Sequence, residues 1–192
     1  MPYNIAIFAS GSGSNAESII NYFSKKTDID VTLIVSNKSD AYVLTRAKNH
    51  NLDTLILDKA HFNSDKKMLD NLSKYNIDFI VLAGFLWLVP AYLVKAFPHR
   101  IINIHPALLP DYGGKGMYGK RVHQAVFDNN ERTSGMTIHY VDEHYDEGHI
   151  IFQEKVELQA SDTPDIIAQK VLELEHRHYA RIIESIIIEQ TS

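Results

Sequence analysis

The segment Arg100-Ile101-Ile102-Asn103-Ile104-His105-Pro106 joins an apolar run to two polar side chains and a proline. A short apolar run of this kind predicts a buried strand. Pro106 lacks an amide N–H and biases His105 towards extended backbone, so regular strand pairing is expected to end there. Because side chains two residues apart on a strand point to the same face, Asn103 and His105 are expected to project together at the mouth of a sheet.

This pair of polar side chains has two interpretations. An amide that donates to an oxygen, next to an imidazole that transfers a proton near neutral pH, is suited to catalysis. The same pair can instead be a polar strand end whose side chains satisfy loop backbone. For an isolated Asn-x-His-Pro motif the structural interpretation is favoured, so a catalytic role needs support from the rest of the chain.

Strands alternate with helices through the first half of the chain. Apolar runs predict strands at 5–9, 31–35, 54–57, 79–84 and 100–104, and helical spacing predicts helices at 16–26, 40–50, 65–75 and 90–97. Alternation of this kind predicts an α/β fold with a Rossmann-like, mostly parallel sheet flanked by helices and joined by right-handed crossovers. Residues 79–84 form the most apolar of these strands and are expected to be central.

The second half of the chain has a different pattern. Residues 111–121 contain four glycines and predict a long irregular segment, which in compact domains is usually functional or mobile. Strands are expected at 137–141 and 150–153, around an acidic loop, as an antiparallel or mixed addition to the sheet. A final helix is expected from Pro164 to about residue 188, after a Thr163 cap. Without a visible linker, residues 1–192 are expected to form a single domain.

Composition narrows the function classes. The chain has 192 residues, 45% of them hydrophobic, and a formal net charge of -5, which argues against nucleic acid as the main partner. The absence of cysteine excludes disulfides and thiolate chemistry. The N-terminus lacks the features of a signal peptide, and no apolar stretch is long enough to span a bilayer. We therefore expect a cytoplasmic protein that acts without a membrane.

Residues 11–16 read Gly-Ser-Gly-Ser-Asn-Ala between the first strand and the first helix. Glycines let backbone N–H groups approach a ligand, and the helix N-terminus adds positive potential, so this loop predicts an anion site. It is not a Walker A loop, because no Gly-Lys-Ser/Thr follows. A dinucleotide site is disfavoured because Ser36-Asn37-Lys38 stands where a ribose-binding carboxylate is expected. The loop suits a single phosphate; the alternative is a tight turn with a serine cap.

Two further segments follow strands. The acidic residues 142–148 do not have EF-hand spacing. They are either a solvated turn or a loop that packs Asp146 against His105, which would raise the pKa of the histidine. Residues 84–90 place Trp87, the only tryptophan, at the end of the 79–84 strand, where open α/β sheets bind ligands. An apolar pocket for a flat heterocycle and simple core packing both remain open there. His139, in the middle of a strand, is interpreted as structural.

Taken together, these motifs resemble the folate-dependent glycinamide ribonucleotide formyltransferases of purine synthesis. The resemblance rests on the 10–15 loop, Ser36-Asn37, Leu82-Ala83-Gly84-Phe85, Asn103-Ile104-His105-Pro106 with Leu108-Leu109-Pro110, and Asp146-x-Gly148. These motifs occur in order and span nearly the whole chain. The resemblance implies the formyltransferase fold and transfer of a formyl group from 10-formyltetrahydrofolate to the amine of 5'-phosphoribosylglycinamide.

The resemblance also implies roles for individual residues. Asn103, His105 and Asp146 would be catalytic, with Asp146 keeping His105 charged and orienting a water. The glycinamide ribonucleotide would bind Gly13, Ser14, Asn15 and Glu175. The folate would bind Leu86, Trp87, Leu88, Val89, Asn103, Asp142, Glu143, His144, Tyr145 and Asp146. Thr137 would lie near the catalytic water. The folate is a co-substrate, no metal is implied, and the protein would be a monomer or homodimer acting on small molecules.

The sequence departs from this family in two places. A basic residue that many relatives place before the 86–89 segment, for the glutamate tail of the folate, is absent. The 113–121 segment is longer than in many relatives, and Lys115, Lys120 or Arg121 could assist binding of the phosphate or of the folate carboxylates.

Three alternative functions remain at this point. One is a sister formyltransferase that acts on methionyl-tRNA or a nucleotide sugar, although such proteins normally carry a further domain. Another is a formyltetrahydrofolate hydrolase, and the last is a non-catalytic nucleotide-binding module.

Overall fold

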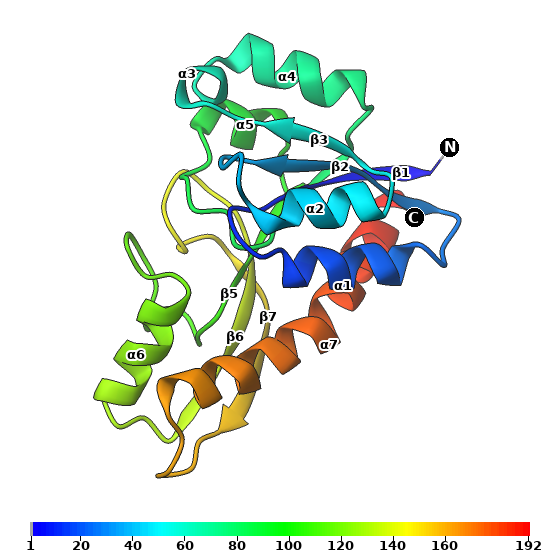
Figure 1. Ribbon diagram of the computed structural model, residues 1–192. Helices are drawn as coiled ribbons and strands as arrows, with labels where there is room; N and C mark the ends of the chain where they lie inside the picture. The colour runs from blue at the N-terminus through cyan, green and yellow to red at the C-terminus, as the bar shows by residue number, and fades with distance from the viewer. Residues whose placement is uncertain (1) are drawn as a thin grey trace.

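A computed structural model describes residues 2–192, without the side chain of His61. Seven strands form one sheet in the order β3-β2-β1-β4-β5-β6-β7 (Figure 1). The first five strands in this order pair in parallel, whereas β6 and β7 are antiparallel to their neighbours. The predicted fold class is therefore confirmed. The strands are β1 Tyr3–Phe8, β2 Ile29–Ser36, β3 Asp53–Ile56, β4 Phe79–Leu82, β5 Ile101–His105, β6 Thr133–Tyr140 and β7 Ile150–Glu157.

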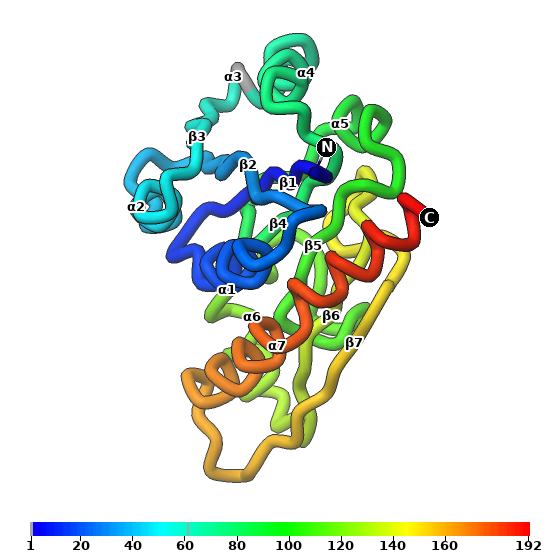
Figure 2. Tube along the Cα trace, turned by 90° about the vertical axis from the view of Figure 1, so that its right-hand side faces the viewer, coloured from blue at the N-terminus to red at the C-terminus, as the bar shows by residue number. Residues whose placement is uncertain are grey.

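Helices cover both faces of the parallel part of the sheet. Figure 1 shows the long C-terminal helix running diagonally across the molecule beside the first helix, and Figure 2 shows the same arrangement from the side. The helices are α1 Ser14–Phe23, α2 Tyr42–Asn49, α3 Lys59–Phe62, α4 Asp65–Lys74, α5 Ala91–Ala96, α6 Lys120–Asp128 and α7 Pro164–Thr191.

Alternation along the buried strands divides the apolar residues between two cores. Ile5 and Ile7 of β1 pack with α1, α2 and α7 on one face of the sheet. Ala6 and Phe8 pack with α3, α4 and α5 on the other face. Such alternation follows from the two-residue period of a strand, and burial of both faces explains why β1 and β4 are apolar almost throughout.

The crevice for a ligand arises where the chain leaves two neighbouring strands in opposite directions. After β1 the chain enters α1, on one face of the sheet, and after β4 it proceeds to α5, on the other face. In open α/β sheets the ligand site lies at this switch point, beyond the carboxyl ends of the strands. Among residues 2–192 no helix combines the length and the apolar character needed to cross a membrane.

The second half differs from the sequence prediction in several boundaries. β6 begins at Thr133, four residues before the expected start, and β7 continues to Glu157. The predicted irregular segment ends in helix α6, which the sequence analysis missed. The sequence indicates this helix only weakly, because Val122 and Val126 alone form its buried apolar face. The glycines that precede it also favour an irregular segment over a helix.

Candidate active site

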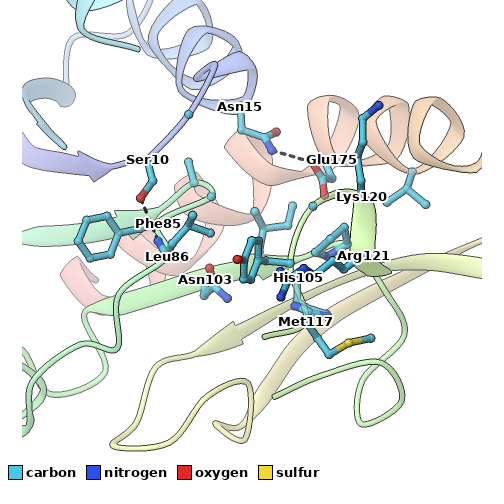
Figure 3. A pocket seen from close by; sticks show the side chains of 18 of the residues that line it. Ser10, Asn15, Phe85, Leu86, Asn103, His105, Met117, Lys120, Arg121 and Glu175 are labelled. Atoms are coloured by element: carbon cyan, nitrogen blue, oxygen red, sulfur yellow. Dashed lines mark hydrogen bonds between the residues drawn. The ribbon is translucent and has the colours of Figure 1, made fainter. Parts of the chain in front are cut away.

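A cavity of about 730 Å³ lies at the carboxyl ends of β1, β4 and β5 (Figure 3). Its walls are the loops that follow these three strands, the irregular segment 114–119 with the start of α6, residues 145–146 and the first half of α7. Cavities of several hundred cubic ångströms accommodate ligands the size of a cofactor. Asn103, His105 and Asp146 all line this cavity, so the structure brings the three predicted catalytic residues together.

Asp146 contacts both other members of this set. Its Oδ2 atom lies 3.4 Å from His105 Nδ1, and its Oδ1 atom accepts a hydrogen bond from Asn103 Nδ2 at 3.3 Å. The backbone N–H of Gly114 also donates to Oδ2, at 3.0 Å. The Asp146 carboxylate therefore links the end of β5 to the glycine-rich segment across the cavity.

Both nitrogens of the His105 imidazole face oxygen atoms. Nε2 lies 2.8 Å from the Tyr112 carbonyl oxygen, and because a carbonyl only accepts, Nε2 must carry a proton. Nδ1 then faces the Asp146 carboxylate. The side chain is buried, and burial lowers the pKa of His105 below its ordinary value, although Asp146 and Tyr112 partly offset this effect. Desolvation is the larger effect, so the net pKa of His105 is lowered even though Asp146 raises it, as the sequence predicts.

Asp146 is held as a carboxylate. Burial raises the pKa of its carboxyl group, but the nearby His139 ring, the proximity of His105 and the Gly114 N–H together outweigh burial and leave the pKa lowered. The backbone at Asp146 has φ 58°, a left-handed conformation that Asp and Asn adopt more readily than most residues. That conformation turns the side chain of this loop residue into the cavity wall.

His139 contacts this same set, which the sequence analysis did not foresee. Its Nδ1 lies 2.9 Å from the Tyr140 carbonyl, so its Nε2 is free to accept from Asn103 Nδ2 at 3.1 Å. It lies opposite Asn103 in the antiparallel pairing of β5 with β6. Asn103 is therefore oriented by His139 and Asp146. This contact depends on the register between two strands, which a single sequence does not reveal.

The predicted anion loop, residues 11–15, lines the opposite wall of the cavity. Among the described residues, none accepts a hydrogen bond from the backbone N–H groups of residues 12–16. Gly13 adopts φ 72° before the first turn of α1. Free N–H groups at the start of a helix are suited to an anion.

Glu175 of α7 contacts the last residue of the anion loop, Asn15. Asn15 Nδ2 donates to Glu175 Oε2 at 2.6 Å, as the dashed line in Figure 3 marks. Burial raises the pKa of Glu175 to about 7, although the hydrogen bond from Asn15 lowers it in part. The Asn15 Oδ1 atom is buried and has no hydrogen-bond partner among the described residues. The Asn15–Glu175 pair therefore offers an unused acceptor, Asn15 Oδ1, and a carboxyl group whose pKa is raised by burial.

The predicted folate-binding residues divide into two groups. Leu86, Asn103, Tyr145 and Asp146 line the cavity, and the Leu86 N–H donates to Ser10 Oγ at 3.0 Å. Trp87 packs against Phe62, with ring centroids 5.6 Å apart, and so belongs to a core rather than to the cavity wall. The remaining members of the predicted set do not line this cavity: Leu88, Val89, Asp142, Glu143 and His144.

Thr137, expected near the catalytic water, lies on β6 opposite His105. Its hydroxyl donates to the Ala107 carbonyl at 2.6 Å and accepts from Leu109 N–H at 3.0 Å and from Gln153 Nε2 at 2.9 Å. The side chain is fully buried and does not line the cavity. All of its hydrogen-bonding capacity is used to hold the turn after β5, so Thr137 shapes the site from behind.

Basic side chains contribute to the cavity from two sides. Lys115, Lys120 and Arg121, which the sequence analysis raised as candidates, all line it, together with Lys38 from the loop after β2. Figure 3 shows Lys120 and Arg121 at the start of α6. His123, a buried member of α6, also lines the cavity and was not foreseen, because its helix was not predicted. The cavity is thus suited to anionic ligands.

Comparison with known proteins agrees with this geometry. The formyl transferase family matches residues 3–183. Phosphoribosylglycinamide formyltransferase from the chloroplast of Arabidopsis thaliana is 44% identical over 97% of this chain, which spans 66% of the length of that relative. The enzyme of the same name from Bacillus subtilis is 32% identical over 95% of this chain and 93% of its own length.

A solved structure shares the whole fold. The crystal structure of phosphoribosylglycinamide formyltransferase from Bacillus halodurans superposes with a TM-score of 0.86, at 36% identity, over 96% of this chain and 95% of the other. The family match covers nearly the whole chain, including every residue of the proposed catalytic set. This chain therefore belongs to the formyl transferase family.

Proposed function

We propose that this protein transfers the formyl group of 10-formyltetrahydrofolate to the amine of 5'-phosphoribosylglycinamide. The products are formylglycinamide ribonucleotide and tetrahydrofolate, and the reaction belongs to de novo purine biosynthesis. One observation carries the proposal: a single cavity has free backbone N–H groups for a phosphate on one wall and Asn103, His105 and Asp146 on the other. The names of the relatives from Arabidopsis thaliana and Bacillus subtilis support the same substrate.

The chemistry of the cavity fits the phosphorylated substrate. Its phosphate would bind the N–H groups of Gly13, Ser14 and Asn15, where none of the described residues competes as an acceptor. The ribose or glycinamide portion would contact the Asn15–Glu175 pair, whose free acceptor Asn15 Oδ1 can receive a hydroxyl or N–H group. The amine would then point towards Asn103 and His105, at the end of β5.

The folate co-substrate would enter along the loop after β4. The wall there has an apolar part, Leu86, and a more polar part, Tyr145 and Asp146. Lys115, Lys120 and Arg121, which line the cavity, are candidates for binding the substrate phosphate or the folate carboxylates. Trp87 supports this wall from the core through Phe62 and Phe85.

The reaction requires one bond to form and one to break. The amine nitrogen of glycinamide attacks the formyl carbon, which gives a tetrahedral intermediate with a negative oxygen. Asn103 donates one of its two Nδ2 hydrogens to this oxygen in place of its 3.3 Å hydrogen bond to Asp146. The positive charge of a protonated His105, whose Nε2–H remains on the Tyr112 carbonyl, stabilises the same oxygen electrostatically. A preorganised donor of this kind contributes roughly 3 kcal/mol. The bond from carbon to N10 then breaks, the amine loses a proton, and N10 gains one through a water that Asp146 orients.

The protonation of His105 is coupled to the chemistry. In the free protein, burial keeps the pKa of His105 below its ordinary value. Negative charge that develops on the formyl oxygen favours the imidazolium, because an adjacent opposite charge raises the pKa of a histidine. Asp146 remains ionised, since its own pKa is lowered, and balances the positive ring. The site therefore gains a positive charge beside the formyl oxygen in the transition state.

Other predicted properties accompany this function. We propose small-molecule substrates only, without a metal ion, nucleic acid or membrane as a partner. A cytoplasmic location and a monomer or homodimer remain predictions.

The test is folate release followed by absorbance, with 10-formyltetrahydrofolate present and 5'-phosphoribosylglycinamide added or omitted. Turnover that requires both substrates, and that is lost in His105→Ala, is expected. Turnover with the folate alone would contradict the proposal and indicate a hydrolase. No turnover with either mixture would indicate a different acceptor or a non-catalytic binding module.

A further inference from the structure

Three successive carbonyl groups of the anion loop are occupied by donors outside the cavity. The Gly11 carbonyl accepts from Val43 N–H at 3.1 Å, and the Gly13 carbonyl accepts from Glu17 N–H at 2.9 Å. Between them, the Ser12 carbonyl accepts from the side chain of Arg46, whose Nε lies 2.9 Å away. Two of the three carbonyls are therefore held by backbone donors and one by a side chain.

Because a peptide group is planar, these contacts also fix the direction in which the N–H groups of the loop point. In a trans peptide the carbonyl of one residue and the N–H of the next point in opposite directions. When α2 holds the Ser12 carbonyl, the N–H of Gly13 is directed away from α2 and towards the opposite side of the loop, where the cavity lies. Rotation of the Ser12–Gly13 peptide changes the φ of Gly13, and glycine tolerates both signs of φ.

Arg46 is itself fixed by an ion-pair network. Its Nη1 lies 3.1 Å from Glu17 Oε2, and the other carboxylate oxygen of Glu17 lies 2.7 Å from His50 Nε2. The hydrogen bond from His50, and then that from Arg46, lower the pKa of Glu17 against the effect of burial. The guanidinium thus joins α1 and α2 and also donates to the loop that precedes α1.

We propose that Arg46 is a positioning residue for phosphate binding: it fixes the Ser12–Gly13 peptide so that its N–H faces the substrate. This inference rests on the proposed function, in which the anion loop binds the phosphate of 5'-phosphoribosylglycinamide. Arg46 does not line the cavity, so it acts through the loop rather than by touching the substrate. Without the Arg46 side chain, the peptide can rotate and present the Ser12 carbonyl to the phosphate, which replaces an attraction by a repulsion.

The test compares Arg46→Met, Arg46→Lys and a matched control, Lys48→Met. Lys48 lies exposed on the same helix, so the control removes an equal charge without touching the loop. In Arg46→Met we expect the KM for 5'-phosphoribosylglycinamide to rise about tenfold, with kcat and the KM for the folate within about twofold of wild type. Arg46→Lys should restore part of the affinity, because one ammonium can reach the Ser12 carbonyl or Glu17 but cannot form the fork. Lys48→Met should match the wild type.

A binding measurement separates this inference from the proposed function. Titration calorimetry with ribose 5-phosphate as the probe reports on the anion loop whether or not the protein transfers a formyl group. A wild type that binds ribose 5-phosphate, and an Arg46→Met variant that binds it about tenfold more weakly, support this inference even if wild-type turnover fails. Equal affinity in wild type and Arg46→Met overturns it. So does a rise of both Michaelis constants together with a fall in kcat, which indicates a general structural role.

Discussion

Asp146 is the residue on which the chemistry of the site converges. Its carboxylate contacts Asn103, His105, His139 and the Gly114 N–H. Replacement of a neighbouring carboxylate by an amide removes the charge that favours an imidazolium. Asn is the suitable substitute, because it preserves the shape and tolerates the positive φ at this position.

We therefore expect Asp146→Asn to lower kcat by about 100-fold or more, in the range that positioned acid–base groups contribute. The pKa of His105, which burial already lowers, should fall further. Steady-state kinetics measure the first effect, and an NMR titration of the His105 ring measures the second. Circular dichroism should show an unchanged fold. A His105 pKa that rises or stays constant in the variant would exclude the electrostatic role of Asp146.

Ionisation of Glu175 makes the free energy of unfolding depend on pH. Its pKa is raised from 4.5 to about 7, so between these values the unfolded chain releases a proton that the folded protein retains. Stability is then greatest below the unfolded pKa and falls as the pH rises through this window. A difference of about 2.5 between the two pKa values corresponds to roughly 3 kcal/mol at most.

Glu175→Gln removes this titration and keeps an amide within reach of Asn15. Denaturant unfolding at pH 5 and pH 8 should show that the variant gains stability relative to wild type as the pH rises. An equal stability difference at both pH values would mean that Glu175 is already ionised in the folded protein at pH 5.

At the scale of elements, sequence periodicity predicted the strands and helices that carry strong apolar patterns. β1, β4 and β5 were found because burial on both faces makes them continuous apolar runs. The start of β6 was missed, because Ser134 and Gly135 are weak strand formers and only pairing with β7 places them in the sheet.

In the candidate site, too, contacts between residues close in sequence were predictable and contacts between distant segments were not. Asn103 and His105 share a strand, so their proximity is local and was predictable from the two-residue period. The contact of His139 with Asn103 depends on pairing between β5 and β6, and Thr137 is buried by a turn that folds back onto β6. Those contacts join distant parts of the chain, and no periodicity within a single segment encodes them.

The junction between β1 and α1 offers a test of loop geometry. A Cβ atom on Gly13 would lie 2.5 Å from Val43 Cγ2, and the φ of +72° is unfavourable for an L-residue. A Cβ atom on Gly11 would meet nothing within 4 Å. We expect Gly13→Ala to reduce the free energy of unfolding by roughly 2 kcal/mol, from strain of about 1–2 kcal/mol plus the close contact. Gly11→Ala should change it by less than about 0.5 kcal/mol. Equal losses in the two variants, measured by urea unfolding, would contradict this account.

At the scale of the whole molecule, one sheet separates two cores. Trp87 packs in the core formed with α3, α4 and α5, whereas α7 covers the opposite face. The two cores share the backbone of the same strands, and the buried Tyr179 of α7 donates to the Leu82 carbonyl of β4 at 2.8 Å. Loss of either core therefore exposes one face of the strands that support the other. This coupling favours the predicted single domain.

The prediction that follows is cooperative unfolding. Trp87 fluorescence reports on one core, and far-ultraviolet circular dichroism reports on all helices, of which α7 is the longest. The two signals should give the same midpoint in urea, and ribose 5-phosphate should shift both equally, because a ligand of the folded state stabilises the whole cooperative unit. If the fluorescence midpoint came first and the ligand moved only the circular dichroism signal, the two faces of the sheet would be separate folding units. The cavity at the strand ends would then depend on the α1, α2 and α7 face alone.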